Sequence, residues 1–123
     1  MNIPKEVYRY IEHELRHYVH YKKELEIEKE LESKNVNNKQ KYSGILSLKR
    51  TTEAIDRTLV KLTNKQKMLF NEIYNKGRTD IDNINQELNI SKKTFARYKQ
   101  SIVYAVGHEL GIVLLKHGDS SDE

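Results

Sequence analysis

The chain has 123 residues and a formal net charge of +4, enough for one small domain or for one domain with an extended helical arm. It has no cysteine, one proline and 33% charged residues, which excludes disulfides and thiolate metal sites and favours an all-α fold in a cytoplasmic protein. No apolar run approaches the width of a bilayer, and the first residues lack the apolar core of a secretory signal, so we expect no membrane association.

The charge is distributed unevenly along the chain, and residues 63–116 carry the largest net positive charge. Residues 1–62 hold 13 basic against 10 acidic residues, residues 63–116 hold nine against five, and residues 117–123 hold none against three. A basic domain attracts polyanions in general, so this excess supports nucleic acid as a partner only together with a binding motif. We expect residues 117–123 to form a disordered acidic tail.

The first 62 residues are predicted to form a long helical hairpin. Residues 5–32 follow Pro4 and are rich in Glu, Lys and Leu, which favours one helix of roughly 40 Å. That is longer than so small a core needs, so we expect it to bind a partner or to mediate homo-oligomerisation. Residues 33–41 are polar and predict a connecting loop, and a second helix runs from Tyr42 to Leu62. Each helix has a predicted seam of mostly apolar residues that recur at steps of three and four: Tyr8, Ile11, Leu15, Tyr18, Lys22 and Leu25, then Ile45, Leu48, Thr52, Ile55, Leu59 and Leu62.

Within the first helix, His13, Glu14 and His17 match the H-E-x-x-H pattern of zinc proteases. A catalytic zinc also needs a third protein ligand in a substantial scaffold with a substrate cleft. In addition, Leu15 belongs to the predicted seam, so the other face of the helix is expected to pack against a neighbour. We therefore expect no enzyme and no stoichiometric zinc after dialysis without chelator. Incidental binding of a transition metal by His13, His17 and His20 stays open. No other catalytic constellation is present, and no cofactor is expected.

Residues 63–116 are predicted to form a trihelical unit. Thr63 and Gln66 have the spacing of a capping box, so a brace helix starts there and continues to Gly77, a natural helix stop. Two further helices, residues 80–88 and 91 to about 110, have the pattern of a helix-turn-helix. Ile84 and Leu88 face inward on the first of them, and Ile90 fills the corner.

The predicted turn has suitable chemistry. Asn89 tolerates the left-handed backbone conformation that a tight turn requires, and Ser91 is a preferred N-cap. In the second helix an inward stripe is formed by Phe95, Tyr98, Ile102 and Val106. The outward set is Ser91, Lys92, Lys93, Thr94, Arg97 and Gln100. We expect double-stranded DNA as the partner, with Lys92, Lys93 and Lys99 contacting phosphates, and with Ser91, Thr94, Arg97 and Gln100 setting register and reading bases.

These residues resemble those of the RinA family of phage late-gene transcriptional activators, which are similar to the promoter-reading helix-turn-helix domain of bacterial sigma factors. The resemblance covers roughly residues 42–112, through LTNKQKMLFNEIY and NISKKTFARYKQSIVYAVGHELG. The chain departs from the commonest helix-turn-helix form at Asn85, where a small residue usually lets the helices approach. The resemblance implies a protein that binds near a promoter and assists RNA polymerase in expressing the packaging and structural genes of a phage or prophage. The positions that fall in the pattern are Ile90, Ser91, Thr94, Arg97, Lys99 and Ile102, and Glu109, Leu110 and Gly111 end it.

Two alternatives stay open. A phage packaging component such as a small terminase subunit also pairs a helix-turn-helix with long oligomerising helices. In a structural or adaptor protein, the hairpin would perform the function and the basic helix would only be solvated. Oligomeric state separates the first two functions, because a ring of many subunits suits packaging and a monomer or dimer suits promoter binding.

Overall fold

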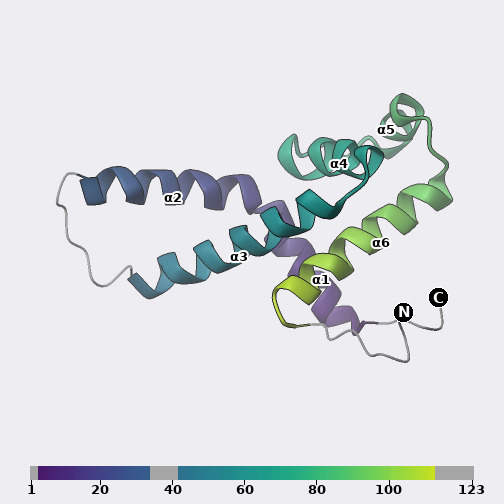
Figure 1. Ribbon diagram of the computed structural model, residues 1–123. Helices are drawn as coiled ribbons and strands as arrows, with labels where there is room; N and C mark the ends of the chain where they lie inside the picture. The colour runs from purple at the N-terminus through teal and green to yellow at the C-terminus, as the bar shows by residue number, and fades with distance from the viewer. Residues whose placement is uncertain (1–2, 34–41, 113–123) are drawn as a thin grey trace.

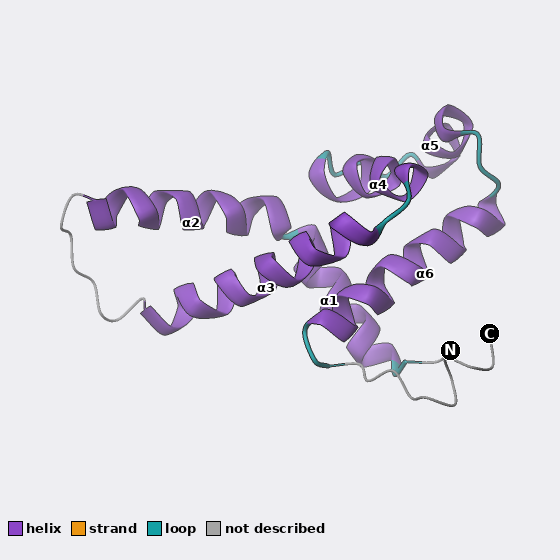
Figure 2. Ribbon diagram, in the orientation of Figure 1, coloured by secondary structure: helices purple, strands orange, loops and turns teal. Residues whose placement is uncertain are grey.

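A computed structural model describes residues 3–33 and 42–112, and every regular element in these two ranges is helical (Figure 2), which confirms the all-α fold. None of these helices combines the length and apolar character that a membrane span requires. The predicted loop, apart from Ser33, and the predicted acidic tail lie outside the described residues. The elements are α1 (Lys5–Arg16), α2 (Tyr18–Ser33), α3 (Tyr42–Lys61), α4 (Asn64–Phe70), the π-helical η2 (Asn71–Asn75), α5 (Ile81–Leu88) and α6 (Lys92–Glu109).

The prediction of a single N-terminal helix over residues 5–32 is wrong, because the chain bends at His17 between α1 and α2. The His17 backbone adopts φ −99° and ψ 2°, and its ring nitrogen Nδ1 lies 2.7 Å from the His13 carbonyl oxygen. The two helices point in different directions in Figure 1, α1 crossing α6 and α2 running beside α3. A straight helix could not pack against both neighbours, so tertiary packing overrides the local preference for one long helix.

The hairpin therefore consists of α2 and α3, which project together from the rest of the molecule in Figure 1. The predicted start of α3 at Tyr42 is confirmed. Thr52 and Ile55 of its predicted seam are buried. The Tyr18 hydroxyl donates a hydrogen bond to Asp56, which ties the start of α2 to the second half of α3.

The brace helix begins as the sequence predicts. The Thr63 hydroxyl accepts a hydrogen bond from the Gln66 amide at 3.3 Å, and the Gln66 side chain accepts one from the Thr63 amide at 3.0 Å, so the capping box is confirmed. After α4 the helix widens into the π-helical turn η2, in which Ile73 and Tyr74 are buried. The chain then leaves the helix at Gly77, whose φ of 68° is one that L side chains rarely adopt.

One hydrophobic core joins the N-terminal and C-terminal halves of the described chain. Ile11 and Leu15 of α1 and Ile55 of α3 are fully buried in the same cluster as residues of α4, η2, α5 and α6. Helix α6 packs against α1 and α3 as well as against α4 and α5. The predicted boundary between residues 62 and 63 therefore crosses a continuous core, which fixes the N-terminal arm directly on the helix that carries the predicted DNA-binding residues.

Candidate nucleic-acid interface

The turn between α5 and α6 has the geometry that its residues predict. Asn89 adopts the left-handed conformation, with φ 56° and ψ 52°, and the Ile90 amide donates to the Asn85 carbonyl at 2.9 Å. The Ser91 hydroxyl accepts a hydrogen bond from the Thr94 amide at 3.0 Å and so caps α6. Both predicted roles are confirmed, and together they fix where α6 begins and which side chains of its first turns face solvent.

Three cations of the predicted site are exposed on the N-terminal half of α6. The Lys92 side chain is 86% exposed, and its ammonium lies 4.0 Å from the carboxylate of the equally exposed Asp82. Lys93 and Arg97 make no ion pair with any residue in the ranges 3–33 and 42–112. A weak, solvated pair such as that of Lys92 leaves its charge available. This end of α6 therefore presents positive charge to solvent.

Some polar side chains of the predicted site cap the start of α6, and the others face solvent. Ser91 and Thr94 are held by the cap, because the Ser91 hydroxyl also donates to the Thr94 hydroxyl at 3.0 Å. Gln100 is exposed one turn beyond Arg97 and borders a hollow between α6 and α3. Arg97 and Gln100 are thus the two predicted base readers whose side chains carry no hydrogen bond to the described residues.

Lys99 lies apart from the other cations. Its ammonium is 3.0 Å from the Glu12 carboxylate of α1, and its side chain is only 24% exposed. Burial opposes ionisation of Glu12, but hydrogen bonds from Tyr74 and Lys99, with the charges of Lys99 and Arg16, lower its pKa below the usual range. The sequence favours a partly buried Lys99, because Lys99 is spaced four residues from Phe95 and three from Ile102 on the inward face of the helix. Lys99 joins α6 to the N-terminal arm.

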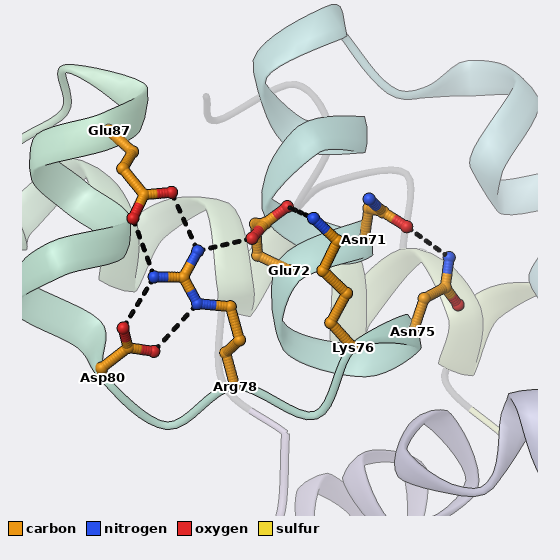
Figure 3. Close-up of polar contacts among 7 residues, drawn as sticks. All are labelled: Asn71, Glu72, Asn75, Lys76, Arg78, Asp80 and Glu87. Carbon is orange, nitrogen blue, oxygen red and sulfur yellow. Dashed lines mark hydrogen bonds and ion pairs between the residues drawn. The ribbon is translucent and has the colours of Figure 1, made fainter.

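A cluster of charged side chains joins the start and end of α5 to η2. Figure 3 shows the Arg78 guanidinium between three carboxylates, with Asp80 at 2.6 Å, Glu87 at 2.8 Å and Glu72 at 2.5 Å. The hydrogen bond from Arg78 lowers the pKa of Asp80 to about 2. Lys76 adds a second cation beside Glu72 at 2.9 Å. Because these acids are paired with Arg78 and Lys76, the cluster fixes the orientation of α5 and offsets much of its negative charge.

The departure at Asn85 has a structural consequence. Its side chain is 6% exposed, and neither its amide nitrogen nor its carbonyl oxygen has a hydrogen-bond partner among the described residues. A buried amide without partners is destabilising, because its bonds to water are lost without replacement. The helices α5 and α6 nevertheless pack closely enough to bury Ile84 and Leu88 beside it.

One further cation lies near the turn, at a position that the sequence pattern does not predict. The Lys65 ammonium of α4 lies 3.4 Å from the Asn89 carbonyl oxygen, which places a further positive charge next to the start of α6. The residues are 24 positions apart, so only the packing of α4 against α5 and α6 brings them together. Lys65 extends the cationic surface beyond the predicted set.

His13 and Glu14 of the zinc-protease pattern lie on α1, and His17 lies at the bend that follows it. The His13 and His17 rings are 4.1 Å apart between centroids, and His17 also stacks on Tyr21. Glu14 accepts a hydrogen bond from the Tyr21 hydroxyl at 2.8 Å. Within residues 3–33 and 42–112, no three His, Asp or Glu side chains are grouped so that they could hold a metal ion.

Comparisons with known proteins give no relative for this chain: no family model, no curated protein and no solved structure matches it significantly.

Proposed function

We propose that this protein is a sequence-specific, double-stranded DNA-binding activator of transcription without enzymatic activity. The observation that supports the proposal best is the exposed side of α6, where Lys93 and Arg97 project from a helix fixed by the Asn89 turn and the Ser91 cap. An α-helix fits the major groove of B-form DNA, whose width is about 12 Å. Exposed cations on such a helix can form ion pairs with DNA phosphates, and a guanidinium can donate two hydrogen bonds to the O6 and N7 acceptors of guanine.

The contacts of these side chains support a modified assignment of roles within the proposal. In the proposal Lys92, Lys93 and Lys65 contact phosphates, while Arg97 and Gln100 read base edges. Ser91 and Thr94 act mainly by starting α6 at the right place, and Lys99 acts through Glu12 rather than on DNA. By the resemblance to phage late activators, the site lies near a promoter and the bound protein assists RNA polymerase on packaging and structural genes.

Selection of bound fragments from bacterial and phage genomes, followed by fluorescence anisotropy on the selected site and on random duplex DNA, tests this proposal. Arg97→Ala should cost about 1 to 3 kcal/mol on the selected site and reduce discrimination. Lys93→Ala should weaken both DNAs alike and lower the slope of log affinity against log salt by about 1. Lys5→Ala, which removes the same charge from the exposed start of α1, is the matched control and should change neither.

Failure to bind duplex DNA even at low salt would refute the proposal. Equal losses for Arg97→Ala on selected and random DNA would refute the assignment of Arg97 as a base reader. Transcription in vitro from the selected promoter, with and without the protein, then tests activation. A protein that binds the site without raising transcript yield would not be an activator.

The hairpin is the proposed contact with a second copy of the chain. Ile27 of α2 is 58% exposed and Leu46 of α3 is 50% exposed, although both are large apolar side chains. Helix α2 holds three basic and five acidic residues, whereas α3 holds four basic and two acidic ones, so the α2 of one copy complements the α3 of another. Light scattering decides the stoichiometry: a dimer supports promoter binding, and a closed ring would favour the packaging alternative.

A further inference from the structure

A hollow of about 430 Å³ lies between α6, the second half of α3 and Ile3. Its volume falls in the range of small-molecule sites. Ile3, Ala105 and the ring of Tyr104 line it with carbon atoms, and all three are half-buried. Thr58 borders it on the α3 side, and its hydroxyl already donates to the Ala54 carbonyl at 3.0 Å. The inner wall of the hollow is therefore mostly apolar.

The hollow is elongated along α6. Its lining on this helix consists of two rows of residues at steps of four: Gln100, Tyr104 and His108, and Ser101, Ala105 and Glu109. From the first to the last of these residues the helix rises about 14 Å, at 1.5 Å per residue. A site of this shape suits an extended alkyl chain better than a compact molecule.

The polar groups around the hollow are mainly hydrogen-bond donors. The Glu109 carboxylate has one oxygen 2.7 Å from the Lys61 ammonium and the other 2.7 Å from Arg57, so both oxygens are engaged. Two cations thus face one carboxylate, and the ammonium keeps further N–H groups free. The hydroxyls of Ser101 and Tyr104 make no hydrogen bond to another described residue. Net positive charge and free donors beside an apolar wall suit a ligand with an apolar body and an anionic end.

We propose that the hollow binds a medium-chain carboxylate, with its alkyl chain against Tyr104 and Ala105 and its carboxylate beside Lys61. Removal of the chain from water drives binding, and the ammonium selects the charge of the head group. Lys61 lies at the Glu109 end of the hollow, so the far end of the chain reaches toward Gln100.

The bound carboxylate weakens the binding of DNA. Gln100 borders the hollow and is also a proposed base reader, and Arg97 lies about one turn before it on α6. A chain packed against Gln100 restricts the conformations in which its amide reaches a base edge. The carboxylate also adds negative charge to the helix that approaches the phosphates. This effect rests on the proposed function, whereas binding of the carboxylate does not.

Titration of ¹³C,¹⁵N-labelled protein with decanoate, below the concentration at which decanoate forms micelles, tests the site without DNA. Decanoate should shift the amide signals of residues 100–109. Its methylene protons should show nuclear Overhauser effects to the methyl groups of Ile3 and Ala105. Decylammonium, which has the same chain and the opposite charge, should bind about fivefold more weakly.

Two pairs of variants locate the chain and the head group, with circular dichroism as the check on folding. Ser101→Phe places a ring in the hollow and should weaken decanoate binding about tenfold. Ala96→Phe is its control, because Ala96 is exposed on α6 and does not border the hollow. Lys61→Met should weaken decanoate binding about threefold to fivefold. Lys67→Met, which removes the same charge from exposed α4, should leave it unchanged.

Fluorescence anisotropy on the selected duplex measures the effect on DNA. Saturating decanoate should weaken DNA binding by the parent about threefold at low salt, and less at high salt. The DNA affinity of Ser101→Phe should not respond to decanoate. Each protein is compared with itself, so a direct effect of the substitution on DNA binding cancels.

Nuclear Overhauser effects at the hollow, with weaker binding by Ser101→Phe and Lys61→Met but not by their controls, support the site. Absence of these effects, or equal losses for Ser101→Phe and Ala96→Phe, overturns it. Equally tight binding of decylammonium at the same residues overturns the choice of an anionic ligand. An unchanged DNA affinity at saturating decanoate overturns the effect on DNA. If the protein binds no DNA, the proposed function fails, while the titration still decides the carboxylate site.

Discussion

The buried amide of Asn85 leads to a prediction that can be worked out in magnitude. Replacing Asn85 by alanine removes two polar atoms that have no partner among the described residues. Relief of an unsatisfied buried amide is worth about 1 to 3 kcal/mol, and alanine adds about 0.6 kcal/mol of helix propensity. Against this stands a cavity of roughly 30 Å³, which costs about 0.7 kcal/mol. Asn85→Ala should therefore stabilise the protein by about 1 to 3 kcal/mol.

Urea unfolding followed by circular dichroism measures this change, with Asn83→Ala as the matched control. Asn83 is exposed on the same helix and donates only a long hydrogen bond, 3.4 Å, to Asp80, so its replacement reports mainly the helix propensity of alanine without relieving a buried amide. The difference between the two variants reports the burial of the Asn85 side chain, together with the exposed hydrogen bond from Asn83 to Asp80. If Asn85→Ala is no more stable than Asn83→Ala, the Asn85 amide is satisfied in solution and the reasoning is refuted.

Three further predictions concern stability. Phe95→Ala should cost about 3 to 5 kcal/mol, because the ring is 9% exposed in the core; a variant as heat-stable as the parent would show that the register of α6 is wrong. Lys99→Met should cost about 1 to 2 kcal/mol in urea unfolding through loss of the Glu12 pair, while leaving the salt dependence of DNA affinity unchanged; a shallower slope would place Lys99 on phosphates. Hydrogen bonds from Arg57 and Lys61 lower the pKa of Glu109 from 4.5 to about 2, so its contribution to stability is present above pH 4.5 and is lost as the pH falls to 2. The urea midpoints of the parent and Glu109→Gln should therefore differ at pH 7 and converge near pH 2, and a constant difference would contradict the pairing.

The features that could be predicted from the sequence are those that depend on near neighbours. The left-handed turn at Asn89, the Ser91 cap and the Thr63 capping box each involve residues within three or four positions, and all are confirmed. The inward stripe of α6 follows from helical spacing alone. The positions of Lys93 and Arg97 on the exposed side follow from the same spacing.

What could not be predicted depends on which helices meet. The bend at His17 arises because α1 and α2 pack against different neighbours, and no residue near His17 signals it as Pro or Gly would. The pairing of Lys99 with Glu12 requires that α1 cross α6. Arg78 gathers its three carboxylates from η2, the α5 cap and α5, and two of them lie six and nine residues away.

The continuous core has a practical consequence for work with fragments. A piece beginning at Thr63 would retain the whole cationic side of α6 but would lose the α1 and α3 surfaces that cover its opposite face. Ile102, Val103 and Val106, all fully buried in the intact chain, would lose that cover. Such a fragment would self-associate through this newly exposed apolar surface. Its failure in a DNA-binding assay would report misfolding rather than an inability of α6 to recognise DNA.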